Sequence, residues 1–98
     1  MTYEEINKLM DGKFEKEYNK FENIPAEDRL AENDTICAML FLYNHLKDKK
    51  KFSLSPAHDI IYLPDVDDLV ELTEEDVLYL TRCGVHYDSS YNCFAIFT

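Results

Sequence analysis

The chain has 98 residues, is 46% hydrophobic and 13% aromatic, and carries a formal net charge of −10. This length predicts one domain over residues 1–98, and the apolar content is too high for a disordered chain. The acidity argues against direct binding to nucleic acid or to an anionic membrane surface.

The first third of the chain reads as helical. Thr2 and Glu5 have the spacing of a capping box and predict a helix over residues 2–11. Aromatic residues then recur at helical spacing over residues 13–22, which extends the helical pattern. The proline at position 25 suits the first turn of a short helix that ends near Leu30.

A longer helix is predicted from Asn33 or Asp34 to about Lys50. It is apolar nearly all round, which is typical of a central helix. The side chains expected to share its main face are Ile36, Met39, Leu40, Tyr43 and Leu46. Lysines complement the dipole at its C-terminal end, namely Lys47, Lys49, Lys50 and Lys51. The expected core combines Ile36, Met39, Leu40 and Tyr43 with Ile61, Leu63, Leu80, Phe94 and Ile96.

The second half changes to β-strand patterns around one helix. A strand is predicted over about residues 58–63, between two prolines. Thr73 is predicted to cap a helix that ends at Gly84. Residues 85–88 and 93–97 then read as a hairpin. The predicted fold is α+β, with N-terminal helices on one face of a small three-stranded antiparallel sheet in the order α-α-α-β-α-β-β.

The distribution of charge is the strongest functional signal. The eight acids from Asp59 to Asp76 have no Lys or Arg among them. Carboxylates in a row imitate the phosphates of a nucleic acid, and Asp68, Glu71 and Glu75 would share a helical face if a helix began near Val66. The alternative is a solvated loop and helix N-terminus, where acids are favoured anyway. With two tyrosines, a residue type suited to interfaces, the predicted partner-binding residues are Asp65, Asp67, Asp68, Glu71, Glu74, Glu75, Asp76, Tyr79 and Tyr91.

Metal sites are only partly matched by the sequence. Asp65, Asp67 and Asp76 fit an EF-hand loop, but Leu69 and Val70 stand where an oxygen ligand and the turn glycine are required. A second pattern, Cys83, His86 and Cys93, is half of a zinc motif, and its cysteines also suit buried positions. We expect no metal and no cofactor.

Catalytic patterns are equally incomplete. Cys83 with His86 could form a nucleophilic pair, as could Ser89 or Ser90 with a histidine. The chain has no nucleophile elbow and no glycine-rich loop. We therefore expect a binding protein and not an enzyme.

We expect a cytoplasmic protein with reduced thiols. The chain has three cysteines, its N-terminus lacks an apolar signal core, and its longest apolar run has eight residues. No lipidation motif is present, and we expect no membrane association. The lysines at 47–51 suit a helix C-terminus, and an alternative use is self-association into a homo-oligomer.

The stretch from Leu72 to Phe97 resembles the ends of small uncharacterised proteins of phages and prophages. An L-T-E-E-D helix start leads to a glycine, an aromatic-Asp-Ser turn and a final aromatic strand. The residues that carry the resemblance are Leu72, Thr73, Glu74, Glu75, Asp76, Gly84, Tyr87, Asp88, Ser89 and Phe97. It implies a phage context, in which small acidic proteins inhibit host defence or replication machinery, as anti-CRISPR proteins do.

These patterns together predict a small acidic protein of the host cytoplasm that binds and inhibits a host nucleic-acid-handling or defence protein. Its acidic surface would compete for a basic groove. One alternative is an adaptor or structural interaction module without inhibitory activity. Another is a small-ligand binder, which would need a concave polar pocket.

Overall fold

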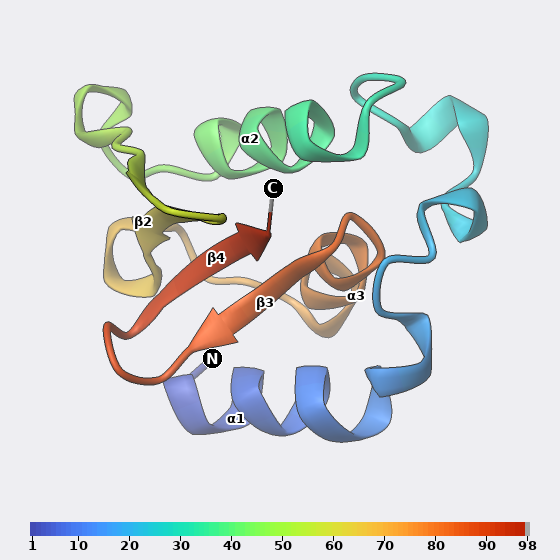
Figure 1. Cartoon of the computed structure of the whole chain (residues 1–98), viewed down its shortest axis with the longest axis horizontal. Coiled ribbons are helices and arrows are strands. Elements are labelled where there is room, and N and C mark those ends of the chain that lie inside the picture. The colour runs from blue at the N-terminus through green and yellow to red at the C-terminus, as the bar shows by residue number, and fades with distance from the viewer. Residues whose placement is uncertain (98) are drawn as a thin grey trace.

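The computed structural model describes residues 1–97 and has an α+β fold (Figure 1). Within these residues there are three α-helices and one four-stranded antiparallel sheet. The helices are α1 (Tyr3–Lys8), α2 (Asp34–Asn44) and α3 (Glu74–Arg82). The strands are β1 (Ser55–Ala57), β2 (Ile60–Asp65), β3 (Val85–Asp88) and β4 (Cys93–Phe97), in the spatial order β1-β2-β4-β3.

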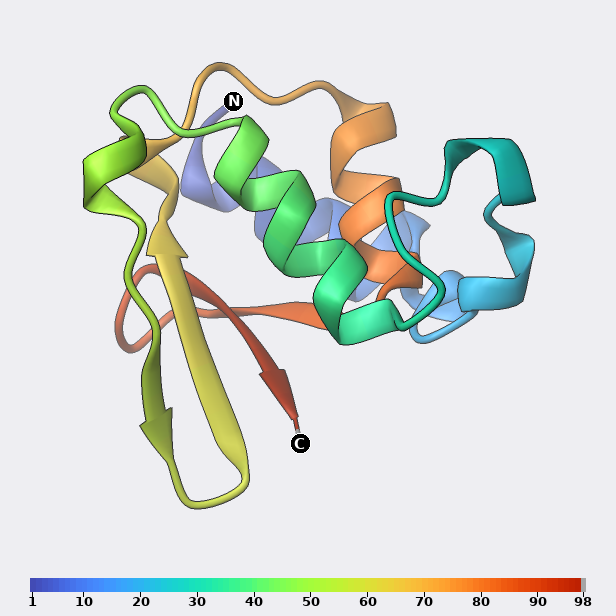
Figure 2. The same cartoon turned by 90° about the horizontal axis from the view of Figure 1, so that it is seen from above.

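The fold class is as predicted, but the sheet has four strands and not three. The additional strand β1 pairs antiparallel with β2, with Ser55 opposite Tyr62. It has three residues, all exposed, and contains Pro56. Such a strand has no alternating apolar pattern, and proline is tolerated there because β1 is an edge strand. The β1–β2 hairpin projects from the body of the molecule (Figure 2).

The helix predicted over residues 13–22 is broken into isolated turns, and the short helix predicted from Pro25 to Leu30 is present only as a 3-10 turn over Ala26–Asp28. After α1 the chain forms one π-helical turn and then isolated 3-10 turns at 15–17, 21–23 and 26–28. Asn19 interrupts the helical pattern because its φ is +62°, and its backbone N–H donates to the carbonyl of Thr81. Tertiary contacts therefore override a weak local propensity.

The long helix also ends earlier than predicted, at Asn44. The chain leaves α2 to pair with a later segment: Leu46 forms an antiparallel bridge with Leu69. The N–H of Lys47 donates to the carbonyl of Asp68 at 3.0 Å. The predicted core face of α2 is wrong at three of its five positions, whereas Leu46 is buried and Met39 packs against the core. Ile36, Leu40 and Tyr43 are exposed, whereas the buried side chains are Cys37, Ala38, Phe41 and Leu42.

The three helices share one core with one face of the sheet. Ile6 of α1, Leu42 of α2 and Leu80 of α3 are fully buried together with Phe94 and Val85 from the sheet. Figure 1 shows α1 and α2 on opposite sides of the molecule, with α3 between them behind β3 and β4. None of the helices in residues 1–97 has the length and apolarity required to cross a bilayer.

The opposite face of the sheet carries aromatic side chains. Ala95 lies between its cross-strand neighbours Tyr62 and His86 and is fully buried. The His86 ring stacks on Phe97 with centroids 4.5 Å apart. Burial lowers the pKa of His86, and no hydrogen-bond partner for its buried Nδ1 is found in residues 1–97.

We predict that stability falls as the pH drops through about 6.5, because the unfolded chain binds a proton there more readily than folded His86 does. Changing His86→Phe keeps an aromatic ring against Phe97 and should make the free energy of unfolding less dependent on pH between about 7.5 and 5.5. Denaturant titrations at several pH values measure this slope. The exposed His58, changed to Asn, is the control, and an equal effect of both substitutions would contradict the assignment.

Candidate partner-binding surface

The residues from Asp65 to Asp76, called the acidic segment below, connect β2 to α3. A single 3-10 turn spans Val66–Asp68, and the chain is then extended until Thr73 starts α3. The segment is therefore not helical from Val66, and a shared helical face for Asp68, Glu71 and Glu75 is wrong. The physical reason is the pairing of Leu69 with Leu46, which needs extended backbone at this point.

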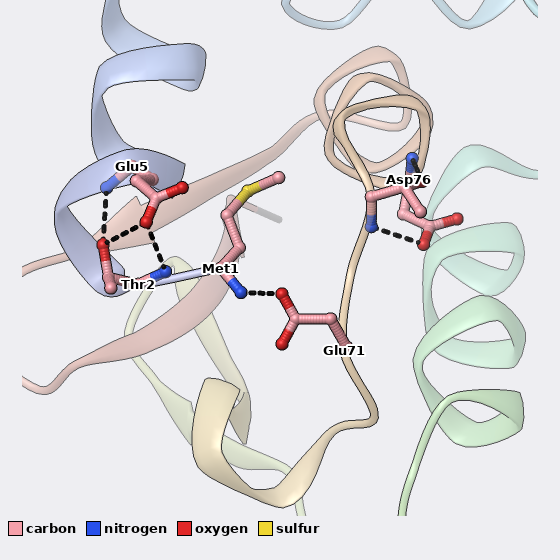
Figure 3. Close-up of polar contacts among 6 residues, drawn as sticks. Met1, Thr2, Glu5, Glu71 and Asp76 are labelled. Atoms are coloured by element: carbon pink, nitrogen blue, oxygen red, sulfur yellow. Dashed lines mark hydrogen bonds and ion pairs between the residues drawn. The ribbon is translucent and has the colours of Figure 1, made fainter.

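The middle of the acidic segment is fixed by the N-terminus of the chain (Figure 3). The Met1 amino group pairs with the carboxylate of Glu71, whose side chain is still 79% exposed. The Tyr3 hydroxyl donates a hydrogen bond to Asp67. This bond to a carboxylate, followed by burial and the charge of Asp67, raises the pKa of Tyr3 to about 12. Two acids of the segment are thus held in place by residues 70 and 64 positions earlier in the chain.

The end of the acidic segment is fixed by the start of α3. Thr73 caps α3 as predicted, and it forms a capping box with Asp76, in which each side chain accepts a hydrogen bond from the other's backbone N–H (Figure 3 draws the bond to Asp76). Lys13 pairs with Glu74 at 3.1 Å. His45 lies 3.8 Å from Asp76. The side chain of Asp76 therefore serves to hold the start of α3. Glu75 is the acid of this helical turn for which no ion pair is found in residues 1–97.

The acidic segment keeps a negative charge after these contacts are counted. Its seven carboxylates lie near three cationic groups: the Met1 amino group, Lys13, and Lys47, which donates to the Asp67 carbonyl. Seven minus three leaves a net charge of −4. The segment contains no cation of its own, so this charge is concentrated along one continuous stretch of chain.

One hollow of about 410 Å³ brings together Glu75, Asp76 and Tyr79. Phe41 contributes an aromatic wall, since its ring stacks on Tyr79 with centroids 4.6 Å apart. The Tyr79 hydroxyl donates to the carbonyl of Asp28, accepts from the N–H of Leu30 and lies 2.8 Å from the Cys37 Sγ. Tyr79 thus anchors the loop before α2, a role that the sequence did not reveal.

Asp65 and Tyr91 lie elsewhere, around a second hollow of about 460 Å³ next to β1 and β2. Tyr91 is 64% exposed and meets Tyr62 edge to face at 5.0 Å. Burial is the main cause that raises the pKa of Asp65. The nine predicted residues are therefore spread over several separate hollows and do not form one compact site.

The cysteines and histidines do not gather into a site. Cys83 is the buried C-cap of α3, and burial raises the pKa of its thiol. Burial and the charge of Asp65 raise the pKa of Cys93 to about 11. Within residues 1–97, no three His, Cys, Asp or Glu side chains lie close enough to hold a metal ion.

Sequence reasoning missed the residues that hold the acidic segment in place. Met1, Tyr3 and Lys13 lie far from it in the chain, and only their closeness in the fold reveals the contacts. The capping boxes, in contrast, were readable from local spacing. Comparison with protein-family models, with curated proteins and with solved structures finds no match for this chain.

We predict that Thr73→Ala destabilises the protein by about 1 kcal/mol, because the substitution removes the cap of α3. Thr73→Ser keeps the hydroxyl and should retain most of the stability. Thermal unfolding followed by circular dichroism measures both variants. Equal melting temperatures for the Ala variant and the wild type would show that the capping box does not hold α3.

Proposed function

We propose that this chain binds the basic surface of a nucleic-acid-handling or defence protein and inhibits it by occupying the groove that otherwise holds nucleic acid. The setting would be the cytoplasm of a phage-infected host. The observation that carries the proposal is the acidic segment: seven carboxylates on one continuous stretch with no cation of its own. A basic groove is the natural partner of such a surface.

The contacts of the acidic segment support a binding role. Side chains that are already ordered lose less conformational entropy on binding. The Met1 amino group, Tyr3 and Lys13 hold Glu71, Asp67 and Glu74, and Glu71 and Glu74 remain mostly exposed. The carboxylates are thereby fixed and still accessible to a cation of the partner.

The hollow beside Glu75 and Asp76 offers a concave site next to these negative charges. Its wall includes Phe41 and Tyr79. The Phe41 ring is stacked on both His45 and Tyr79, so the attraction for an arginine or lysine side chain comes from the carboxylates. A basic side chain of the partner could therefore be anchored there, next to the start of α3. Arg82 also lines this hollow but is paired with Glu17 at 3.0 Å.

A second candidate function is an adaptor without inhibitory activity. It is favoured by the 64% exposure of Tyr91 on the β3–β4 hairpin and by its contact with Tyr62. Aromatic residues of this kind anchor protein interfaces through contact area and depend little on charge. The two candidates thus differ in their response to salt.

We predict that the chain itself does not bind DNA or RNA. Residues 57–98 hold nine acids and one base, Arg82, so a phosphate backbone is repelled by this half of the molecule. An electrophoretic mobility shift assay at ~100 mM salt checks this. Sub-micromolar binding would contradict the proposal.

We predict that the immobilised chain captures a protein from the heparin-binding fraction of a bacterial lysate, and that duplex DNA releases it. Changing Glu71→Lys and Glu75→Lys together should abolish capture, because two carboxylates that face the basic groove would become like charges. The melting temperature should fall only slightly, since the helix-end charge of Glu75 contributes ~0.3–1 kcal/mol and the exposed ion pair of Glu71 with the Met1 amino group contributes about 1 kcal/mol or less.

A matched control changes Asp11→Lys and Asp59→Lys, two exposed acids outside the acidic segment. This variant has the same net charge as the first and should still capture the partner. Equal capture by all three proteins, or a captured protein that DNA does not release, would refute a groove-binding role and favour the adaptor.

A further inference from the structure

The outer face of α2 carries an apolar stripe that the fold does not cover. Ile36, Leu40 and Tyr43 are 51%, 39% and 41% exposed, and their spacing of i, i+4 and i+7 places them on one side of the helix. Helix α2 lies along one edge of the molecule in Figure 1 and crosses the side that faces the viewer in Figure 2. Aliphatic side chains exposed in a row are typical of an interaction surface.

The two ends of this stripe carry opposite charges. The exposed Glu32 lies just before the N-terminal end of α2, and the exposed Lys49, Lys50 and Lys51 follow its C-terminal end. Among residues 1–97, no ion pair is found for any of these four side chains. Lys49 donates to the Tyr43 carbonyl at 2.8 Å, and its Nζ lies 5.2 Å from the centre of the Tyr43 ring. The basic patch therefore continues directly from the apolar stripe.

We propose that the stripe is covered by a second copy of the chain, with the two α2 helices packed antiparallel about a two-fold axis. In this arrangement Leu40 meets Leu40 of the other copy at the axis. Ile36 meets Tyr43, and the acidic end of one helix faces the lysines of the other. A two-fold interface must be self-complementary, and a helix with an apolar middle and oppositely charged ends meets this requirement when it is paired antiparallel.

The same features make a second copy a better occupant than an unrelated partner. The lysines at 49–51 are a local basic cluster in a chain of net charge −10, and the exposed Glu32 lies beyond the opposite end of α2. The stripe is distinct from the acidic segment, so the dimer does not rest on the proposed function. Three side chains make a small interface, and the dimer should therefore dissociate in the micromolar range.

The test is sedimentation velocity of the full chain from ~10 μM to ~1 mM, the range in which a small interface dissociates. The wild type should convert from monomer to dimer within it. Leu40→Asp should remain monomeric, since it places two carboxylates at the axis, and circular dichroism should show that the variant is folded. A monomeric wild type at all concentrations would overturn the proposal.

Charge reversal tests the antiparallel geometry. Lys50→Glu and Glu32→Lys should each raise the dissociation constant of the dimer roughly tenfold. Each substitution removes two ion pairs, because the two-fold symmetry repeats every contact. The protein with both substitutions recovers the wild-type net charge of −10 and should recover the dimer. Glu4→Lys, on α1 at the opposite side of the molecule, has the same charge change as Glu32→Lys and should not weaken it. Failure of the double variant to dimerise, or an equal loss with Glu4→Lys, would overturn the antiparallel arrangement.

Discussion

The short antiparallel contact between the chain after α2 and the acidic segment organises this protein. Leu46 and Leu69 are buried and form the bridge, and the N–H of Val70 donates to the carbonyl of His45 at 2.7 Å. The contact ends α2 and leaves the lysines at its C-terminal end exposed. It also keeps the acidic segment extended, so that its carboxylates spread along an edge instead of lying on a helix.

The sequence predicted the elements that depend on local chemistry. Thr73 caps α3 as expected, and Gly84 takes a φ of +88° just after that helix. At that position an added Cβ would lie 2.9 Å from the Asn19 side chain, so glycine is needed there. The hairpin of residues 85–97 was predicted at its observed bounds, because turn residues and β-branched or aromatic runs are local signals.

The parts that depend on distant contacts could not be predicted. Because α2 is apolar nearly all round, periodicity cannot tell which side faces the core, and the predicted face included the exposed Ile36, Leu40 and Tyr43. The acids at the candidate surface were found from charge alone. Their positions follow from Tyr3 and the Met1 amino group, which no spacing rule connects to them.

The function proposed above requires the acidic segment to bind its partner through charge. The most direct measurement is the affinity of the chain for its captured partner, determined by titration calorimetry from ~50 to ~500 mM salt. The electrostatic screening length is several-fold shorter at the high end of this range than at the low end. We predict that the logarithm of the dissociation constant rises steeply and linearly with the logarithm of salt concentration. An affinity that does not change with salt would contradict binding through charge and would place the binding energy in aromatic contacts such as those of Tyr91.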